Sequence, residues 1–163
     1  MVIPLMLNEK KTVLDVDPTE RLANILRREK LFSVKKGCTK GCCGSCTILL
    51  DGKPVPSCLL PVALAKDSSI ITLEHFMKSA DYSDIEKGFE KAGVHLCGYC
   101  NAGKIFTAWD IIQTYSRPKH EDLYEAVSHM TYCCTDRDTY INGILHAILF
   151  RNERMGINRN ERK

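Results

Sequence analysis

The N-terminal half of the chain alternates short apolar runs with polar turn residues. Apolar and β-branched residues dominate the runs at 2–7, 12–16, 47–50, 53–55 and 70–73, which predicts a strand in each. Asn8 and the polar residues after it predict a hairpin turn between the first two runs. Asp51-Gly52 predicts a second tight hairpin, because this pair favours the type I′ turn. The half is therefore expected to form a small mixed sheet.

A helix is expected between the two hairpins, from Asp17 to about Lys30. Asp17 suits the N-cap, and Pro18 suits the first helical position because its missing amide hydrogen is not needed there. Leu22 and Ile25 follow at helical spacing. The helix should therefore lay one apolar face across the sheet.

Beyond His75 the apolar positions recur every three or four residues instead. This period predicts helices at 83–91, 101–115, 121–130 and 138–150. Short helices joined by brief loops are typical of a small bundle. Trp109 lies on the apolar face of the second of these helices and is expected in its core.

Composition narrows the possible functions. The chain has 163 residues, 44% of them hydrophobic, and a net charge of +3, which gives no argument for a nucleic-acid partner. No apolar run approaches the length of a membrane span, and the first residues are too few for a signal peptide. Nine cysteines in such a chain favour the reducing cytoplasm. The basic end, residues 151–163, is expected to be solvated or to face a partner.

The loop from Gly37 to Cys46 carries the strongest chemical signal. Cys38, Cys43 and Cys46 have the spacing C-x4-C-x2-C, and Cys58 follows the second hairpin. This is the plant-type pattern for a 2Fe–2S cluster, whose irons prefer soft, anionic thiolates. Glycines allow the loop to wrap closely and to aim backbone N–H groups at the sulfurs. Cys38, Cys43, Cys46 and Cys58 are therefore the predicted ligands.

Two other kinds of site also use several cysteines. A structural zinc site also uses four cysteines, but it usually shows two separated C-x2-C pairs. A disulfide framework needs an oxidising compartment and usually an even number of cysteines. Cys42 is predicted to be a bystander beside the cluster. Lys35, Lys36 and Lys40 crowd the loop, as a solvated patch or as a docking surface for an acidic partner.

The helical half has two further cysteine pairs. Cys97 and Cys100 precede a predicted helix start, where the positive end of the helix dipole would stabilise thiolates. Cys133 and Cys134 lie between the last two predicted helices. Cysteines at the helix ends of one bundle could hold a second cluster, although a lone C-x2-C also occurs in zinc and redox-disulfide sites.

With both regions considered, the chain resembles the small iron–sulfur subunits of the molybdenum hydroxylases, the family of xanthine dehydrogenase, aldehyde oxidoreductase and carbon monoxide dehydrogenase. The motifs that carry the resemblance are Gly37-Cys38 through Cys46 to Asp51-Gly52, Ser57-Cys58-Leu59, Cys97-Gly98-Tyr99-Cys100, Gly103 and Cys134-Thr135. They lie in both halves of the chain.

The resemblance implies an α+β protein. A β-grasp ferredoxin-like domain is expected at 1–76, and a four-helix bundle domain at 77–163, each with one 2Fe–2S cluster. It also implies an electron-transfer role. Electrons would pass from a large molybdopterin-binding subunit to the bundle cluster, then to the ferredoxin-like cluster, and then to an FAD-binding subunit. This chain would contain no catalytic residue for the substrate.

Cys133 and Cys134 depart from the family pattern Cys-Arg-Cys-Thr. Ungapped alignment places Tyr132 at the first cysteine, Cys133 at the arginine and Cys134 at the second cysteine. Adjacent residues of an extended segment point in opposite directions, so Cys133 and Cys134 could share an iron only on a kinked backbone. We predict that Cys133 takes the fourth ligand position. The rivals are Tyr132 as an oxygen ligand and an incomplete, labile cluster.

Two further departures flank the first pair. Leu96 stands where the family has a pterin-contacting glutamine, and Asn101-Ala102 stands where it has Thr-Pro. The missing glutamine keeps open a free-standing ferredoxin-like carrier without a molybdenum partner. A zinc-stabilised interaction module is the alternative from another class.

Overall fold

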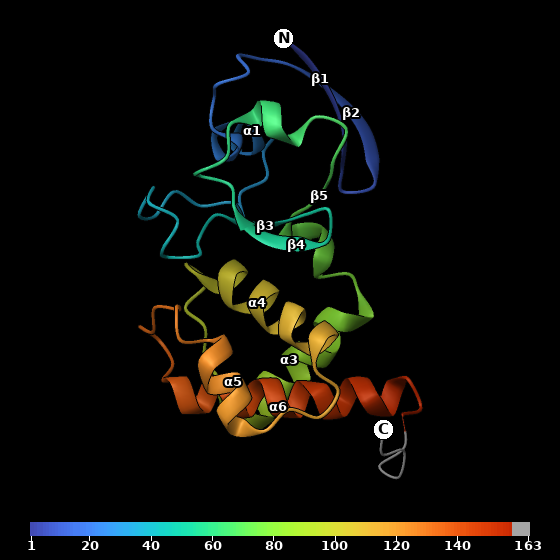
Figure 1. The fold of residues 1–163 in the computed structure, drawn as a ribbon, viewed down its shortest axis with the longest axis vertical. Helices are drawn as coiled ribbons and strands as arrows, with labels where there is room; N and C mark the ends of the chain where they lie inside the picture. The colour runs from blue at the N-terminus through green and yellow to red at the C-terminus, as the bar shows by residue number, and fades with distance from the viewer. Residues whose placement is uncertain (158–163) are drawn as a thin grey trace. The chain divides into compact units, whose positions relative to one another are not determined.

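The structure is a computed structural model that describes residues 1–157, and the chain forms two compact units (Figure 1). The first unit comprises residues 1–78 and 98–106, and the second comprises residues 79–97 and the chain from Thr107 onward. All strands of the described residues lie in the first unit, while helices make up most of the second. The predicted α+β class is therefore confirmed.

The first unit is built on a five-stranded sheet with the order β2-β1-β5-β3-β4. Its strands are β1 (Val2–Leu7), β2 (Lys10–Asp15), β3 (Thr47–Leu50), β4 (Lys53–Pro56) and β5 (Ser69–Ile71). β1 and β5 run parallel, and the other neighbours run antiparallel. Each run that predicted a strand overlaps one, although β2 begins two residues before its predicted run.

Both predicted hairpins are present, and both turn through left-handed backbone. Asn8 and Glu9 have φ of 50° and 66°, and Asp51 and Gly52 have φ of 49° and 77°. Two successive positive φ angles match the twist of the flanking strands. The hairpins therefore fix the registers β1–β2 and β3–β4.

Helix α1 (Leu22–Arg28) begins later than predicted, with Arg21 and not Asp17 at its N-cap. The Asp17 carboxylate accepts a hydrogen bond from the Thr19 N–H at 2.8 Å, which closes a local turn in place of a helix start. The helix then packs on the sheet as expected. Its buried residues, Leu22, Ala23, Ile25 and Leu26, share one core with the strands.

Two short elements were not predicted, η1 (Val62–Ala65) and α2 (Leu73–Phe76). The run 70–73 was expected to be strand throughout, but β5 ends at Ile71. The reason lies next to it, where the Asn8 side chain accepts a hydrogen bond from the Thr72 N–H at 2.9 Å. This side-chain bond replaces a strand partner, and the chain turns into α2.

The second unit contains α3 (Ala80–Ala92), α5 (His120–Ala126), α6 (Arg137–Arg154) and the C-terminal part of α4 (Asn101–Thr114). Figure 1 shows α3 lying against α6, and a Cβ built on Gly88 of α3 would stand 2.4 Å from the Ala147 backbone nitrogen of α6. Glycine at this position therefore allows the two backbones to touch.

The basic end of the chain is not simply solvated. Arg151 is 7% exposed, and its guanidinium donates to the Ile112 carbonyl. The Arg154 Nε lies 2.7 Å from a carboxylate oxygen of the buried Asp84. Arg151 and Arg154 join α6 to α4 and α3. The prediction of a solvated end is wrong for Arg151, which is buried, but not for Arg154, which is exposed as well as ion-paired. Residues 158–163 of that segment lie outside the described residues. Within 1–157, no helix has the length and apolar character to cross a membrane.

Candidate metal centres

The loop at residues 37–46 follows a path that needs small residues. Thr39, Gly41 and Gly44 all have positive φ, at 55°, 76° and 75°. Gly37 is required for a different reason, because a Cβ there would stand 2.6 Å from the Cys43 Sγ. Any side chain at Gly37 would therefore collide with the Cys43 sulfur and the Ser45 hydroxyl.

Backbone N–H groups of this loop point at sulfur atoms. The N–H groups of Lys40 and Cys43 donate to the Cys38 Sγ at 3.4 and 3.3 Å, and the Cys38 N–H donates to the Cys43 Sγ at 3.4 Å. The backbone hydrogen bonds from Lys40 and Cys43 lower the pKa of the Cys38 thiol to about 6. The loop therefore stabilises a thiolate, the form of cysteine that binds metals.

Cys46 and Cys58 form a second, buried pair. Cys46 precedes β3 and is 2% exposed, while Cys58 follows β4 and is 9% exposed. Ser57 joins their segments by donating its hydroxyl hydrogen to the Cys46 carbonyl at 2.7 Å. Burial, with the Cys58 thiol as a neighbour, raises the pKa of Cys46 to about 11. Such a thiol keeps its proton until a cation takes the proton's place.

Cys42 differs from these four cysteines. Its side chain is exposed, and a hydrogen bond with the Cys38 side chain is the main reason that its pKa is raised. The loop therefore does not favour a thiolate at Cys42.

The turn before α4 carries Cys97, which is exposed, and Cys100, which is 7% exposed. Within the first unit, the Lys35 ammonium donates to the Gly98 carbonyl, and the Tyr99 hydroxyl donates to the Lys36 carbonyl at 3.3 Å. These bonds fasten the turn to the segment that opens the first cysteine loop. Lys35 is thus half-buried and has a structural partner, which a solvated patch would lack.

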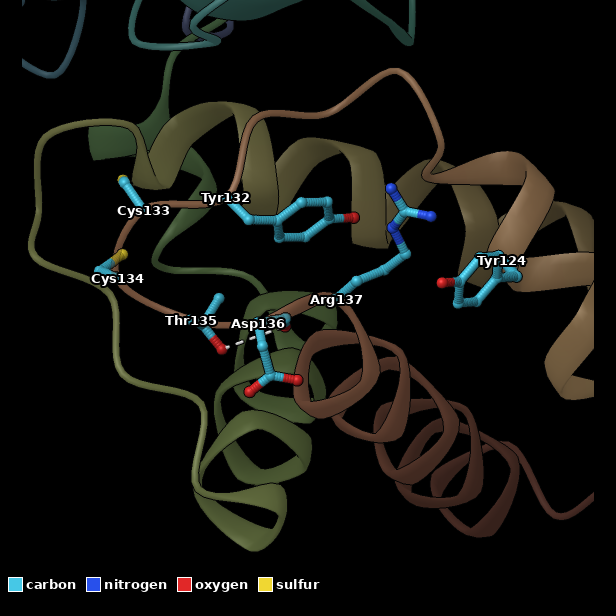
Figure 2. A pocket seen from close by; sticks show the side chains of 7 residues that line it. All are labelled: Tyr124, Tyr132, Cys133, Cys134, Thr135, Asp136 and Arg137. Carbon is cyan, nitrogen blue, oxygen red and sulfur yellow. Dashed lines mark hydrogen bonds between the residues drawn. The ribbon is translucent and has the colours of Figure 1, made fainter.

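Cys133 and Cys134 lie on a bent segment before α6, at the edge of a cavity of about 680 Å³ (Figure 2). Their Sγ atoms lie within 4.8 Å of each other. Adjacent side chains of an extended segment would point to opposite sides, so the bend at 133–135 is what brings the two thiols together. The kink that a shared metal would require is present.

Tyr132 lies differently. Figure 2 shows its ring directed away from both cysteines and toward Arg137, whose Cζ is 5.7 Å from the ring centroid. The Tyr132 hydroxyl donates to the Val127 carbonyl at 3.1 Å, and burial raises the pKa of this phenol. An oxygen ligand would have to be a phenolate, which this environment opposes.

The residues present fit iron–sulfur clusters. Thiols come in pairs, backbone donors face the sulfurs at one pair, and only glycine at position 37 avoids a clash with the Cys43 sulfur. Cys100 also has a neighbour that sequence reasoning missed, the ammonium of Lys104 at 3.2 Å from its Sγ. The sequence contained one indication of this contact, because Lys104 follows the candidate ligand Cys100 by one helical turn.

Two sequence families match the chain. The family described as "2Fe-2S iron-sulfur cluster binding domain" matches residues 5–69, and the family described as "[2Fe-2S] binding domain" matches residues 72–149. The chain is also 35% identical, over 89% of its length and 88% of the relative, to the nicotine 6-hydroxylase small subunit of Paenarthrobacter nicotinovorans.

The chain belongs to the family of small iron–sulfur subunits of the molybdenum hydroxylases. Another member, the nicotinate dehydrogenase small FeS subunit of Eubacterium barkeri, is 36% identical over 83% of this chain and 87% of that relative. The solved structure of quinoline 2-oxidoreductase from Pseudomonas putida 86 matches with a TM-score of 0.83 and 34% identity, covering 96% of this chain and 97% of that one.

Membership in this family defines the role of the chain. Two 2Fe–2S binding domains follow each other along it. The related chains are subunits of oxidoreductases. This iron–sulfur subunit is therefore an electron-transfer component of an oxidoreductase complex, and the family match favours iron–sulfur clusters over a structural zinc site.

Proposed function

We propose that this chain relays electrons from a molybdenum centre in a large molybdopterin-binding subunit to FAD in another subunit. When bound, the two 2Fe–2S clusters would supply one-electron carriers for that transfer. The observation that carries the proposal is the set of N–H groups directed at Cys38 and Cys43. Hydrogen bonds to cluster sulfurs are among the features by which a protein sets a cluster's potential.

We assign the ligands of the first cluster as two pairs, Cys38 with Cys43 and Cys46 with Cys58. Each iron of a 2Fe–2S cluster takes two protein ligands, so paired thiols are the expected arrangement. Support comes from the bonds between the Cys38 and Cys43 segments and from the contact between the Cys46 and Cys58 thiols. Cys42 is left out because it belongs to neither pair and because its hydrogen bond with the Cys38 side chain raises the pKa of its thiol.

For the second cluster we propose Cys97, Cys100, Cys133 and Cys134. The short Sγ–Sγ separation of Cys133 and Cys134 supports both as ligands, and the Tyr132 hydroxyl has the Val127 carbonyl as its partner. Cys100 precedes the first turn of α4, where the helix dipole favours a thiolate.

The proposal also includes the boundaries and the fold of the two domains. We assign residues 1–76 to a β-grasp domain and residues 77–163 to a four-helix bundle, although residues 98–106 group with the first compact unit and residues 158–163 lie outside the described chain. The sheet with parallel β1 and β5 and the packing of α3 on α6 support this division. A cytoplasmic location is proposed from nine cysteines, whose thiolates a reducing compartment would preserve for metal binding.

Co-purification tests the partners. We expect a tagged chain, expressed with its native neighbours and purified without oxygen, to bring along chains that contain molybdenum and FAD. Stopped-flow mixing with substrate should then reduce iron–sulfur absorbance before the flavin spectrum changes. A chain that purifies alone and still carries iron would instead be a free-standing carrier, and the relay proposal would fail.

A further inference from the structure

Lys104 is a buried lysine in the first turn of α4. It is 2% exposed, and its Nζ lies 3.2 Å from the Sγ of Cys100, which precedes the helix and is 7% exposed. Both residues lie in the first unit. Residues four apart face the same side of a helix, so the backbone itself directs the ammonium toward this sulfur.

This position is unfavourable for a positive charge in two ways. Burial removes the ammonium from water, which is costly without a charged or hydrogen-bonded partner. The N-terminal turn of a helix already carries partial positive charge, and the first turn of α4 contains no acidic residue. An anionic sulfur at Cys100 would offset both effects, because hydrogen bonds between ions are the stronger ones.

We infer that Lys104 is the cation that raises the reduction potential of the second cluster, through its contact with the Cys100 sulfur. The inference rests on the proposed role of Cys100 as a ligand. A cluster held by thiolates carries net negative charge, and reduction adds one more negative charge. A buried ammonium at a ligand sulfur stabilises the reduced form more than the oxidised form, so it raises the potential.

A potentiometric titration followed by EPR tests this on the intact chain with both clusters. Lys104→Met keeps the length of the side chain and removes its charge, and Lys104→Gln removes the charge but keeps a donor. Lys87→Met is the matched control, since Lys87 is exposed on α3. The first cluster serves as an internal reference in every sample.

We expect both Lys104 variants to lower the reduction equilibrium constant of the second cluster at least tenfold, which is about 59 mV for one electron. The first cluster and the Lys87→Met protein should keep their potentials. An unchanged second potential, or an equal shift of both clusters, would overturn the inference alone. Absence of a second cluster from the unaltered protein would overturn the proposed ligand set, and the inference with it.

Discussion

Gly44 and Gly103 bring two cysteine-bearing segments into backbone contact. A Cβ built on Gly103 would stand 2.7 Å from the Gly44 Cα and 2.9 Å from the Gly44 carbonyl oxygen. Gly44 lies between two candidate ligands of the first loop, and Gly103 lies in the first turn of α4, just after Cys100. Both glycines belong to the first unit. Segments about 60 residues apart in the sequence thus approach as closely as backbones allow.

This contact predicts that Gly103→Ala destabilises the protein, which is the opposite of the usual effect of this substitution in a helix. Alanine in place of glycine within a helix normally stabilises a protein by about 0.5–1 kcal/mol. Here the added methyl group would push the first cysteine loop away from α4, and overpacking typically costs about 1–3 kcal/mol. We therefore expect a lower free energy of unfolding, measured by denaturant titration of the cluster-loaded protein. A gain in stability would show that the two segments are not in contact.

Substitutions at Cys42 and Cys58 test which cysteines hold the first cluster. Cys58→Ser should abolish the EPR signal of the first cluster, because it removes a thiolate from the buried pair. Cys42→Ser should leave that signal intact, since Cys42 lies outside both pairs and its thiol has a raised pKa. EPR spectra of the reduced proteins, normalised to protein concentration, provide the measurement. Loss of the signal in Cys42→Ser would require a different ligand set.

Substitutions also show whether Cys133 or Tyr132 is a ligand of the second cluster. We expect Cys133→Ser to remove or strongly weaken the second EPR signal while the first remains. Tyr132→Phe should keep both signals, because the Tyr132 hydroxyl donates to the Val127 carbonyl. If Tyr132→Phe lost the second signal and Cys133→Ser kept it, the tyrosine would be the ligand.

Glu74 gives a prediction for pH dependence. Its carboxylate accepts hydrogen bonds from the Ser33 N–H at 2.6 Å and from the Ser33 hydroxyl. Burial acts to raise the pKa of Glu74, but these bonds outweigh it and hold the pKa below the ordinary 4.5. The carboxylate therefore stabilises the fold above the unfolded-state pKa, and this contribution is lost as pH falls through the folded-state pKa.

The corresponding substitution is Glu74→Gln. At pH 7 it should lower the free energy of unfolding by about 1 kcal/mol, the loss expected for a partly exposed charged hydrogen bond. The difference from the unaltered protein should shrink as pH falls below about 4.5, where Glu74 gains its proton in the unfolded chain. Denaturant titrations of both proteins at matched pH give the difference directly. A gap that stays constant across this range would show that the charge of Glu74 contributes nothing.

Much of the fold follows from local patterns. The five strands appear where apolar runs meet turn residues. Asp51-Gly52 forms a hairpin turn, and Gly93, with a φ of 72°, ends α3. The element boundaries that were predicted wrongly have a common cause. The start of α1 depends on a bond between Asp17 and Thr19, and the end of β5 depends on one between Asn8 and Thr72. Such competing side-chain bonds leave no periodic signal.

For the candidate sites too, local patterns were predictable and tertiary contacts were not. Cysteine spacing singled out the residues, because ligand spacing is a local property of a loop. The neighbours of those residues depend on tertiary packing. The spacing of Lys104 from Cys100 therefore did not reveal that this lysine is buried, and no local pattern indicated that Lys35 binds the Gly98 carbonyl. Arg151 was expected to be solvated or to face a partner for the same reason, since arginine is usually exposed.

Metal analysis of the chain purified without oxygen, combined with EPR of the reduced protein, tests the central claim most directly. Two 2Fe–2S clusters predict about four irons per chain and two distinct signals that differ in relaxation or potential. About two irons with a single signal, or zinc in place of iron, would contradict the assignment of eight cysteine ligands.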